Sequence, residues 1–481
     1  MNQFTKYISK KSIPDPSASH HWLTLPLCSW QMKSVLHHSH CLTFPALYIY
    51  MYARKLAVLM VLSLVSLSIQ GRSNADSLTV VEADTLVSDT LTDVIADSLA
   101  AEITDTIAND SLPWPQSLQC HLATIIEKSD FLNQSQLGMM VYDLTSDSVL
   151  FTHNHRQTMR PASTMKLITA ITAFDRLGGS YQFKTRLRYN GEIIDSIRTL
   201  NGDVYLVGGM DPRFNRDDIL AFVESLKSLG IDSIHGSIYA DKSMKDRDLL
   251  GEGWCWDDDN PVLTPTLYSR KDRLIDQFVT ELDKAGIVFD GGIGERATPP
   301  SCKVACTRSH SIDQILVKMM KDSDNLYAES MFYQTAATHS LPAKASGARA
   351  VTQSLIRKVH LNPLHYKIAD GSGLSLYNYL SAELEIAFLR YAYVNSTIFN
   401  HIYPALPVAG VDGTLAKRMK GTTAAHNVHA KTGTLTGISS LAGYVKAANG
   451  HMLAFCIINQ GVLRAAHAKA FQNKVCVAMT K

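Results

Sequence analysis

Two residues near the start of a predicted helix have the types and spacing that serine catalysis requires. Ser163 and Lys166 lie three positions apart, which places the Lys166 amine on the same helix face as the Ser163 hydroxyl. Lys166 can take the serine proton if burial and nearby positive charge lower its pKa, and the helix N-terminus favours a developing oxyanion. Taken alone, a Ser-x-x-Lys segment is weak evidence, because it is more often a solvated helix start.

A second segment, Ser323-Asp324-Asn325, follows an apolar helical stretch and leads into a helix predicted to begin at Leu326. It can be a helix N-terminus in which Ser323 is the cap and Asn325 forms the turn. In a catalytic interpretation, Ser323 relays a proton to a leaving amine. Asn325 then hydrogen-bonds to the substrate backbone and to Lys166.

A third segment, Lys431-Thr432-Gly433-Thr434, lies inside a predicted strand. Gly433 weakens a strand unless another backbone must approach closely. In a catalytic interpretation, Lys431 and Thr432 bind a substrate carboxylate, and the backbone amides of Ser163 and Thr434 form an oxyanion hole.

In this order and in these contexts, the three segments are typical of serine acyl-transferases that bind penicillin. From about residue 118 to the C-terminus the chain resembles the D-alanyl-D-alanine carboxypeptidase/endopeptidases known as class C low-molecular-mass penicillin-binding proteins. The resemblance rests on Pro161-Ala162-Ser163-Thr164-Met165-Lys166-Leu167, Gly208-Gly209-Met210-Asp211-Pro212, Asp370-Gly371-Ser372-Gly373-Leu374-Ser375, Pro407-Val408-Ala409-Gly410-Val411-Asp412-Gly413-Thr414-Leu415 and His429-Ala430-Lys431-Thr432-Gly433-Thr434-Leu435.

The resemblance implies a serine hydrolase that cleaves the terminal D-Ala-D-Ala bond, or peptide cross-links, of peptidoglycan through an acyl-enzyme on Ser163. It also implies acylation by penicillin and other β-lactams. No cofactor is expected, and no metal is expected because no Cys/His cluster has zinc spacing. Asp211 is a candidate to meet a free amine of the stem peptide, but a turn residue before Pro212 has an equal structural explanation. The chain departs from the family pattern at Leu376, where the family often carries Arg, and in a shortened insertion between Trp254 and Cys302.

Two other functions use the same motifs. A β-lactamase or esterase would release the acyl group rapidly, but the chain has no Glu-x-x-Leu-Asn segment, and position 323 is Ser instead of the Tyr of class C β-lactamases. A non-catalytic peptidoglycan sensor would have no need of Lys166. The peptidase is therefore the favoured hypothesis.

The periodicity of apolar residues predicts a mixed α/β fold, with an antiparallel sheet and a helical lobe interrupted by an inserted α/β region. A helix and a hairpin are expected near residues 118–152, and three adjacent antiparallel strands at 427–434, 438–446 and 451–459. We assign residues 116–186 and 304–481 to a penicillin-binding catalytic domain. Residues 187–303 form the expected insertion.

The N-terminal region predicts export. Arg54 and Lys55 precede the apolar run 56–69, and small residues follow at Ser73 and Ala75, so residues 1–75 are interpreted as a leader and signal peptide cleaved near Ala75. Translation can start at Met51, and an uncleaved anchor remains open as the only membrane contact. Residues 76–115 are an expected disordered tether, with nine acidic and no basic side chains between 76 and 114.

These features predict a periplasmic or envelope location. The overall net charge of +2 gives no indication of nucleic-acid binding. An oxidising compartment permits disulfides among the six cysteines that follow residue 75, but buried free thiols are at least as plausible an interpretation.

Overall fold

The computed structural model describes residues 112–256 and 259–481. All of these residues belong to one compact unit. The predicted leader and export signal, and the acidic tether as far as residue 111, lie outside the described residues. No helix among residues 112–256 and 259–481 is long and apolar enough to cross a membrane.

The main sheet has five antiparallel strands in the order β14-β15-β16-β1-β2. The strands are β1 (Gln136–Asp143), β2 (Ser148–His153), β14 (His429–Leu435), β15 (Ile438–Lys446) and β16 (Met452–Gln460). The predicted hairpin and the three predicted C-terminal strands are confirmed. They join into one sheet because β1 pairs with β16 along its whole length.

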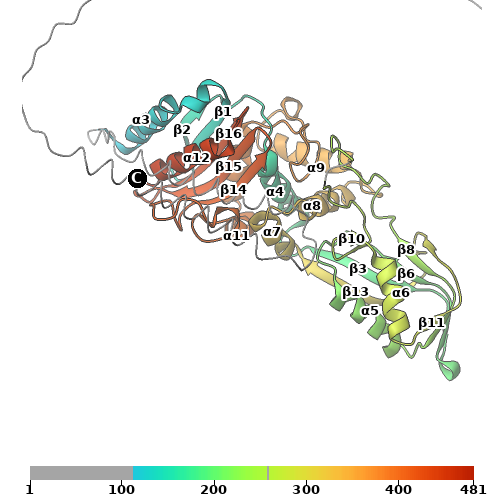
Figure 1. The fold of residues 1–481 in the computed structure, drawn as a ribbon. Coiled ribbons are helices and arrows are strands. Elements are labelled where there is room, and N and C mark those ends of the chain that lie inside the picture. Colours follow the sequence, from blue (N-terminus) through green and yellow to red (C-terminus); the bar gives the residue numbers. More distant parts are fainter. Residues whose placement is uncertain (1–111, 257–258) are drawn as a thin grey trace, which may run out of the picture. The chain divides into compact units, whose positions relative to one another are not determined.

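Helices cover both faces of this sheet, which explains why β15 is buried at all but its last residue. On one face, α3 (Trp114–Glu127) packs with α12 (Ala465–Met479), and Leu118, Leu122 and Phe471 join strand residues in one core cluster (Figure 1). On the other face, α4 (Met165–Leu177) and α10 (Ala382–Val394) share a second core cluster with the sheet.

The helical lobe surrounds α4. Ten consecutive residues of α4, from Met165 to Phe174, are buried because helices pack on all its sides. The neighbours are α7 (Ile312–Lys321), α8 (Asn325–Ala337), α9 (Ala345–Lys358), α10 and α11 (Ser396–Ala405). Gly178, at a left-handed φ of 79°, ends α4 as its position in the sequence predicts.

The inserted region has its own core, with a five-stranded sheet in the order β12-β8-β6-β3-β13 and a four-stranded sheet in the order β11-β7-β5-β4. The strands are β3 (Gln182–Tyr189), β4 (Glu192–Ile194), β5 (Thr199–Asn201), β6 (Val204–Val207), β7 (Ser233–His235), β8 (Ile238–Asp241), β11 (Val288–Phe289), β12 (Ile293–Glu295) and β13 (Lys303–Ser311), beside a short β9 (Leu267–Tyr268) and β10 (Lys271–Asp272) pair. Helices α5 (Arg216–Ser228) and α6 (Leu274–Lys284) complete it (Figure 1). The predicted mixture of strands and helices in this region is confirmed.

The two longest strands of the insertion cross the boundaries expected from the sequence. β3 begins at Gln182 and β13 ends at Ser311, so the inserted sheet includes residues 182–186 and 304–311, which the sequence assigns to the catalytic domain. An alternating polar and apolar pattern predicts a strand but not the sheet that it joins, since pairing partners come from distant sequence. β3 and β13 pair with each other across more than a hundred residues.

Candidate active site

The predicted nucleophile lies in a tight turn. Ser163 is the middle residue of a 3-10 turn (Ala162–Thr164) that leads directly into α4. Ala162 has a left-handed φ of 50°. Ser163 is partly exposed, whereas the residues that follow it in α4 are buried.

Lys166 lies under Ser163 on the same helix face, as the spacing predicts. Its amine contacts Ser163 Oγ at 3.0 Å, Asn325 Oδ1 at 2.7 Å and the Ser372 carbonyl at 2.8 Å. Burial lowers the pKa of Lys166 to about 8, and the negative charges of Asp370, Glu329 and Asp324 oppose this shift. An amine with this pKa is close enough to neutrality at physiological pH to act as a general base.

The second motif joins the same cluster with a different local structure from the one expected. Asp324, not Ser323, caps α8, because its Oδ1 accepts a hydrogen bond from the Tyr327 amide at 3.3 Å. The alternative interpretation of Ser323 as the helix cap is therefore wrong. Ser323 has a left-handed φ of 59°, and its hydroxyl instead accepts a hydrogen bond from Lys431 Nζ at 2.7 Å.

The third motif brings a second buried lysine to the site. Lys431 on β14 donates to Ser323 Oγ and, at 2.8 Å, to the Thr432 carbonyl. Burial and the positive charge of Lys166 hold the pKa of Lys431 well below its usual range. Thr432 Oγ1 donates to Thr414 Oγ1 at 2.7 Å, and Thr434 is exposed on the same strand.

Gly433 meets the close approach that its strand position predicts. A Cβ at this residue would lie 2.1 Å from Ser440 Oγ, 2.7 Å from the Pro161 carbonyl and 2.9 Å from the Ser163 nitrogen. The absence of a side chain therefore lets β14 lie against the nucleophile turn, with the Ser163 amide beside the strand that carries Thr434.

Asp211 does not join this cluster. Its side chain is buried, Oδ1 accepts a hydrogen bond from the Arg213 amide at 3.0 Å, and Oδ2 pairs with His310 Nδ1 at 2.6 Å. Among the hydrogen bonds and ion pairs of the described residues, none joins Asp211 to the three motifs. This geometry supports the turn interpretation, and a role in meeting an amine stays a prediction.

The loop 370–375 contributes groups that sequence reasoning did not identify. The Ser372 carbonyl contacts Lys166, and the buried Glu329 accepts hydrogen bonds from the Gly371 and Ser372 amides. The only signal for Glu329 was an acidic residue one helical turn after Asn325, on a helix that is buried on every side. Thr414, whose hydroxyl accepts a hydrogen bond from Thr432, lies in the segment 407–415 and has no role predicted from the sequence.

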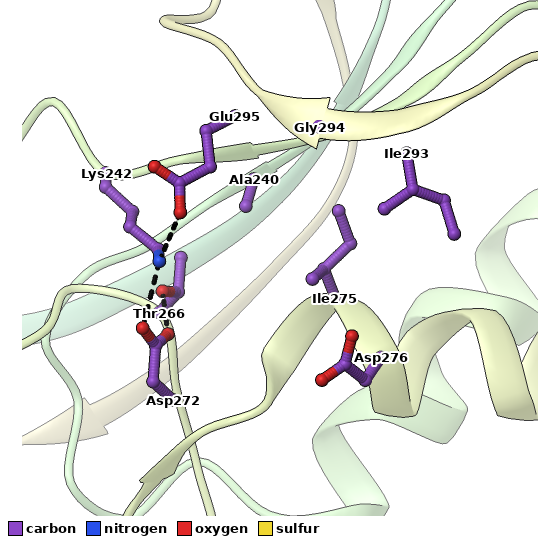
Figure 2. A pocket seen from close by; sticks show the side chains of 9 residues that line it. All are labelled: Ala240, Lys242, Thr266, Asp272, Ile275, Asp276, Ile293, Gly294 and Glu295. Atoms are coloured by element: carbon purple, nitrogen blue, oxygen red, sulfur yellow. Dashed lines mark hydrogen bonds and ion pairs between the residues drawn. The ribbon is translucent and has the colours of Figure 1, made fainter.

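A separate cavity of about 250 Å³ lies in the inserted region. Figure 2 shows Lys242 held between Asp272 and Glu295 on one side of it, and the apolar side chains Ile275 and Ile293 on the other. None of its lining residues belongs to the three motifs.

The described part of the chain contains no group of three or more His, Cys, Asp or Glu side chains that could hold a metal ion. Its six cysteines are all free thiols, at positions 120, 255, 302, 306, 456 and 476.

Comparison with known proteins gives concordant results. A family model described as the D-Ala-D-Ala carboxypeptidase 3 (S13) family matches residues 118–270 and 263–481. A D-alanyl-D-alanine carboxypeptidase of Actinomadura sp. is 27% identical over 426 residues, which cover 67% of this chain and 77% of the relative. The D-alanyl-D-alanine carboxypeptidase DacB of Haemophilus influenzae is 25% identical over 407 residues, covering 67% of this chain and 84% of the relative.

Among solved structures, penicillin-binding protein 4 (dacB) of H. influenzae superposes with a TM-score of 0.68 at 22% identity, covering 74% of this chain and 98% of that chain. The same protein complexed with a novel β-lactam superposes with a TM-score of 0.63 at 23% identity, covering 75% and 99%. At these identities the likeness establishes the fold.

Proposed function

Since the chain belongs to the D-Ala-D-Ala carboxypeptidase 3 (S13) family and is a serine-type carboxypeptidase that acts on peptidoglycan, we propose that its reaction proceeds through an ester on Ser163. One observation carries the proposal. A buried lysine amine with a lowered pKa lies 3.0 Å from a partly exposed serine hydroxyl. Lysine and serine in this relation form a base and nucleophile pair.

Acylation follows from this pair. Neutral Lys166 takes the hydroxyl proton as Ser163 Oγ bonds to the carbonyl carbon of the penultimate D-alanine. The amides of Ser163 and Thr434 stabilise the oxyanion of the tetrahedral intermediate. The carbon–nitrogen bond then breaks, and the proton held by Lys166 returns through Ser323 to the nitrogen of the departing D-alanine.

The substrate carboxylate supplies the anion that Lys431 lacks. Lys431 is buried next to the positive charge of Lys166, so its ammonium form is disfavoured in the free enzyme. A carboxylate bound beside Lys431 and the Thr432 hydroxyl stabilises that form through charge-assisted hydrogen bonds. Asn325, fixed against Lys166, is the proposed partner of the substrate backbone.

Deacylation distinguishes a peptide from penicillin. With a peptide, D-alanine leaves and water attacks the ester carbon, so that the ester bond breaks and Ser163 regains its proton. With penicillin, the amine stays tethered to the acyl group and obstructs the approach of water. We therefore expect penicillin to remain as a long-lived ester on Ser163.

The substrate of a peptidoglycan carboxypeptidase lies in the cell envelope. The basic residues, apolar run and small residues before Asp76 support a periplasmic location reached through a cleaved signal peptide. N-terminal sequencing of protein from the envelope is expected to find a mature start near residues 72–76. A cytosolic protein that still begins at Met51 would contradict this location.

Intact-protein mass spectrometry after addition of penicillin tests the nucleophile. One adduct is expected to persist for many minutes on the native protein, to be absent in Ser163→Ala and to form slowly in Lys166→Ala. Ser148→Ala, which changes an exposed serine of β2, is the matched control and should label normally. Labelling of Ser163→Ala would mean that the nucleophile lies elsewhere.

The same experiment distinguishes the proposed peptidase from a β-lactamase. Rapid loss of the adduct with an excess of hydrolysed drug would identify a β-lactamase. Incubation with cross-linked and uncross-linked muropeptides would measure endopeptidase activity, our further proposal for this site, against carboxypeptidase activity. A protein that labels but cleaves neither substrate would act as a sensor.

A further inference from the structure

Lys166 must point its nitrogen lone pair at Ser163 to act as a base, and its other contacts determine whether it does so. A neutral amine has two N–H bonds and one lone pair. Lys166 Nζ has two contacts besides Ser163, namely Asn325 Oδ1 at 2.7 Å and the Ser372 carbonyl at 2.8 Å. When these two acceptors take the two N–H bonds, the lone pair is left for the Ser163 hydroxyl.

The Ser372 carbonyl belongs to a loop held by a buried carboxylate of α8. Glu329 Oε1 accepts hydrogen bonds from the Ser372 amide at 2.8 Å and the Gly371 amide at 3.1 Å, and Oε2 lies 3.2 Å from the Gly371 amide. On the other side of the loop, Thr169 Oγ1 of α4 donates to the Gly371 carbonyl at 2.6 Å. The peptide between Gly371 and Ser372 is thus fixed from both α8 and α4.

The loop packs tightly on both sides. A Cβ on Gly371 would lie 2.5 Å from Cβ of Phe332, and one on Gly373 would lie 1.9 Å from the Ala162 carbonyl. The loop therefore fills the space between α8 and the nucleophile turn, where a small displacement of the Ser372 carbonyl would move Lys166 relative to Ser163.

Glu329 also contributes charge. Lys166 on α4, Tyr333 on α8 and Asp370 on the loop interact electrostatically with Glu329, and Asp324 on α8 and Lys431 on β14 interact in turn with Lys166. Burial and Asp370 raise the pKa of Glu329 to about 8, whereas the Gly371 and Ser372 amides favour its ionised form. Those amides can only donate, so they bind the carboxylate better than the acid. The carboxylate is the main form above about pH 8, which is also the range where Lys166 loses its proton.

We propose that Glu329 is a positioning residue for acylation, in which its carboxylate fixes the Gly371–Ser372 peptide so that the Ser372 carbonyl directs the Lys166 amine at Ser163, while its negative charge keeps that amine basic. The inference rests on the proposed roles of Ser163 and Lys166. It adds a residue from outside the three motifs, one that acts through Lys166 and does not touch the substrate.

The test is the pH dependence of the second-order rate constant for acylation by penicillin in the full chain. The rate rises with pH as Lys166 loses its proton. Removing a nearby negative charge lowers the pKa of a lysine, so Glu329→Gln should shift this rise to lower pH by about one unit. The maximum rate should also fall about tenfold or more, because the base is weaker and less well directed.

Glu329→Asp distinguishes the effect of the carboxylate charge from the effect of the side-chain length. It keeps the carboxylate but is one methylene shorter, so we expect a lower maximum rate with the rise at its native pH. Glu281→Gln, which removes a carboxylate paired with Lys284 on α6 of the inserted region, is the matched control and should leave the profile unchanged.

Native rates and an unshifted profile in a folded Glu329→Gln protein would overturn the proposal. If that variant does not fold, native rates in Glu329→Asp would overturn it equally, since the shortened side chain cannot hold the loop. Normal acylation of Lys166→Ala would instead refute the proposed function itself, so the two failures are distinguishable.

Discussion

Glu385 on α10 is a buried acid next to the nucleophile turn, and its burial favours the protonated form. Its Oε1 lies 2.7 Å from Thr164 Oγ1, next to the nucleophile, and its Oε2 lies 3.5 Å from Cys456 Sγ. Thr164 Oγ1 also lies 2.9 Å from the Pro161 carbonyl, which can only accept. The single Thr164 proton can serve only one of these two acceptors, and Ser440 Oγ also donates to the Pro161 carbonyl, so both the protonated and the ionised form of Glu385 fit the hydrogen bonds.

The electrostatic environment distinguishes the two forms of Glu385. Burial raises the pKa of Glu385 from 4.5 to about 7, because an isolated charge in the core is poorly solvated. The folded chain therefore holds this proton more tightly than the unfolded chain between those two values. Its stabilising contribution is complete below pH 4.5 and is lost as the pH rises through 7. At 1.36 kcal/mol for each pKa unit, the loss is about 3 kcal/mol.

Glu385→Gln tests this prediction because glutamine has the shape and the donor of the protonated acid at every pH. We would measure the free energy of unfolding by urea for both proteins from pH 4.5 to 8. Their difference cancels most other titrating groups, and it should change in favour of the variant by about 3 kcal/mol over this range. Glu383→Gln controls for the loss of a less buried carboxylate from the same helix. A constant difference between the native protein and Glu385→Gln would refute the reasoning.

Three further substitutions test the geometry of the site. Lys431→Ala should slow acylation by peptide and penicillin about 10- to 100-fold without unfolding the protein, because the substrate carboxylate loses a charge-assisted partner; a native rate would mean that Lys431 is only a strand residue. Gly433→Ala should slow acylation about 10²- to 10³-fold, because its Cβ would displace β14 from the Ser163 amide and disrupt the oxyanion hole; stopped-flow acylation at the native rate would contradict this. Asp211→Asn should lower thermal stability through the loss of the charged His310 pair while penicillin acylation continues. Selective loss of turnover on peptides with a free amine would instead support the substrate role.

The conjunction of the three motifs was sufficient to predict that they meet, because their order and contexts are typical of serine acyl-transferases that bind penicillin. Ser163 and Lys166 share a helix face, and Gly433 has no reason to lie in a strand unless a backbone approaches it. In the structure that backbone is the nucleophile turn. The fold class was also predictable from the sequence, because the apolar periodicity that predicts three C-terminal strands corresponds to β14, β15 and β16.

The features that the sequence could not predict depend on contacts between distant residues. Asp324 and Ser323 are equally good caps by residue type. The choice between them depends on Lys431, which lies 108 residues later in the sequence and donates a hydrogen bond to the Ser323 hydroxyl. By residue type and position, Glu329 is an ordinary helical glutamate. Its role depends on the loop 370–375, whose Gly371 and Ser372 amides donate hydrogen bonds to it. The limits of the insertion depend on the pairing of β3 with β13, which no local pattern specifies.

The backbone around the nucleophile explains why two glycines from distant motifs are needed. Ala162 adopts a left-handed conformation that costs a non-glycine residue about 1 kcal/mol or more. Such a turn persists only when its surroundings impose it. The surroundings here are hydrogen bonds from Ser440 Oγ and Thr164 Oγ1 to the Pro161 carbonyl.

Gly373 and Gly433 pack against the same turn, at positions where any Cβ would collide with its backbone. The loop 370–375 and β14 therefore close on the turn from separate parts of the chain. The nucleophile is thus positioned before a substrate arrives, and binding energy need not be spent on ordering it.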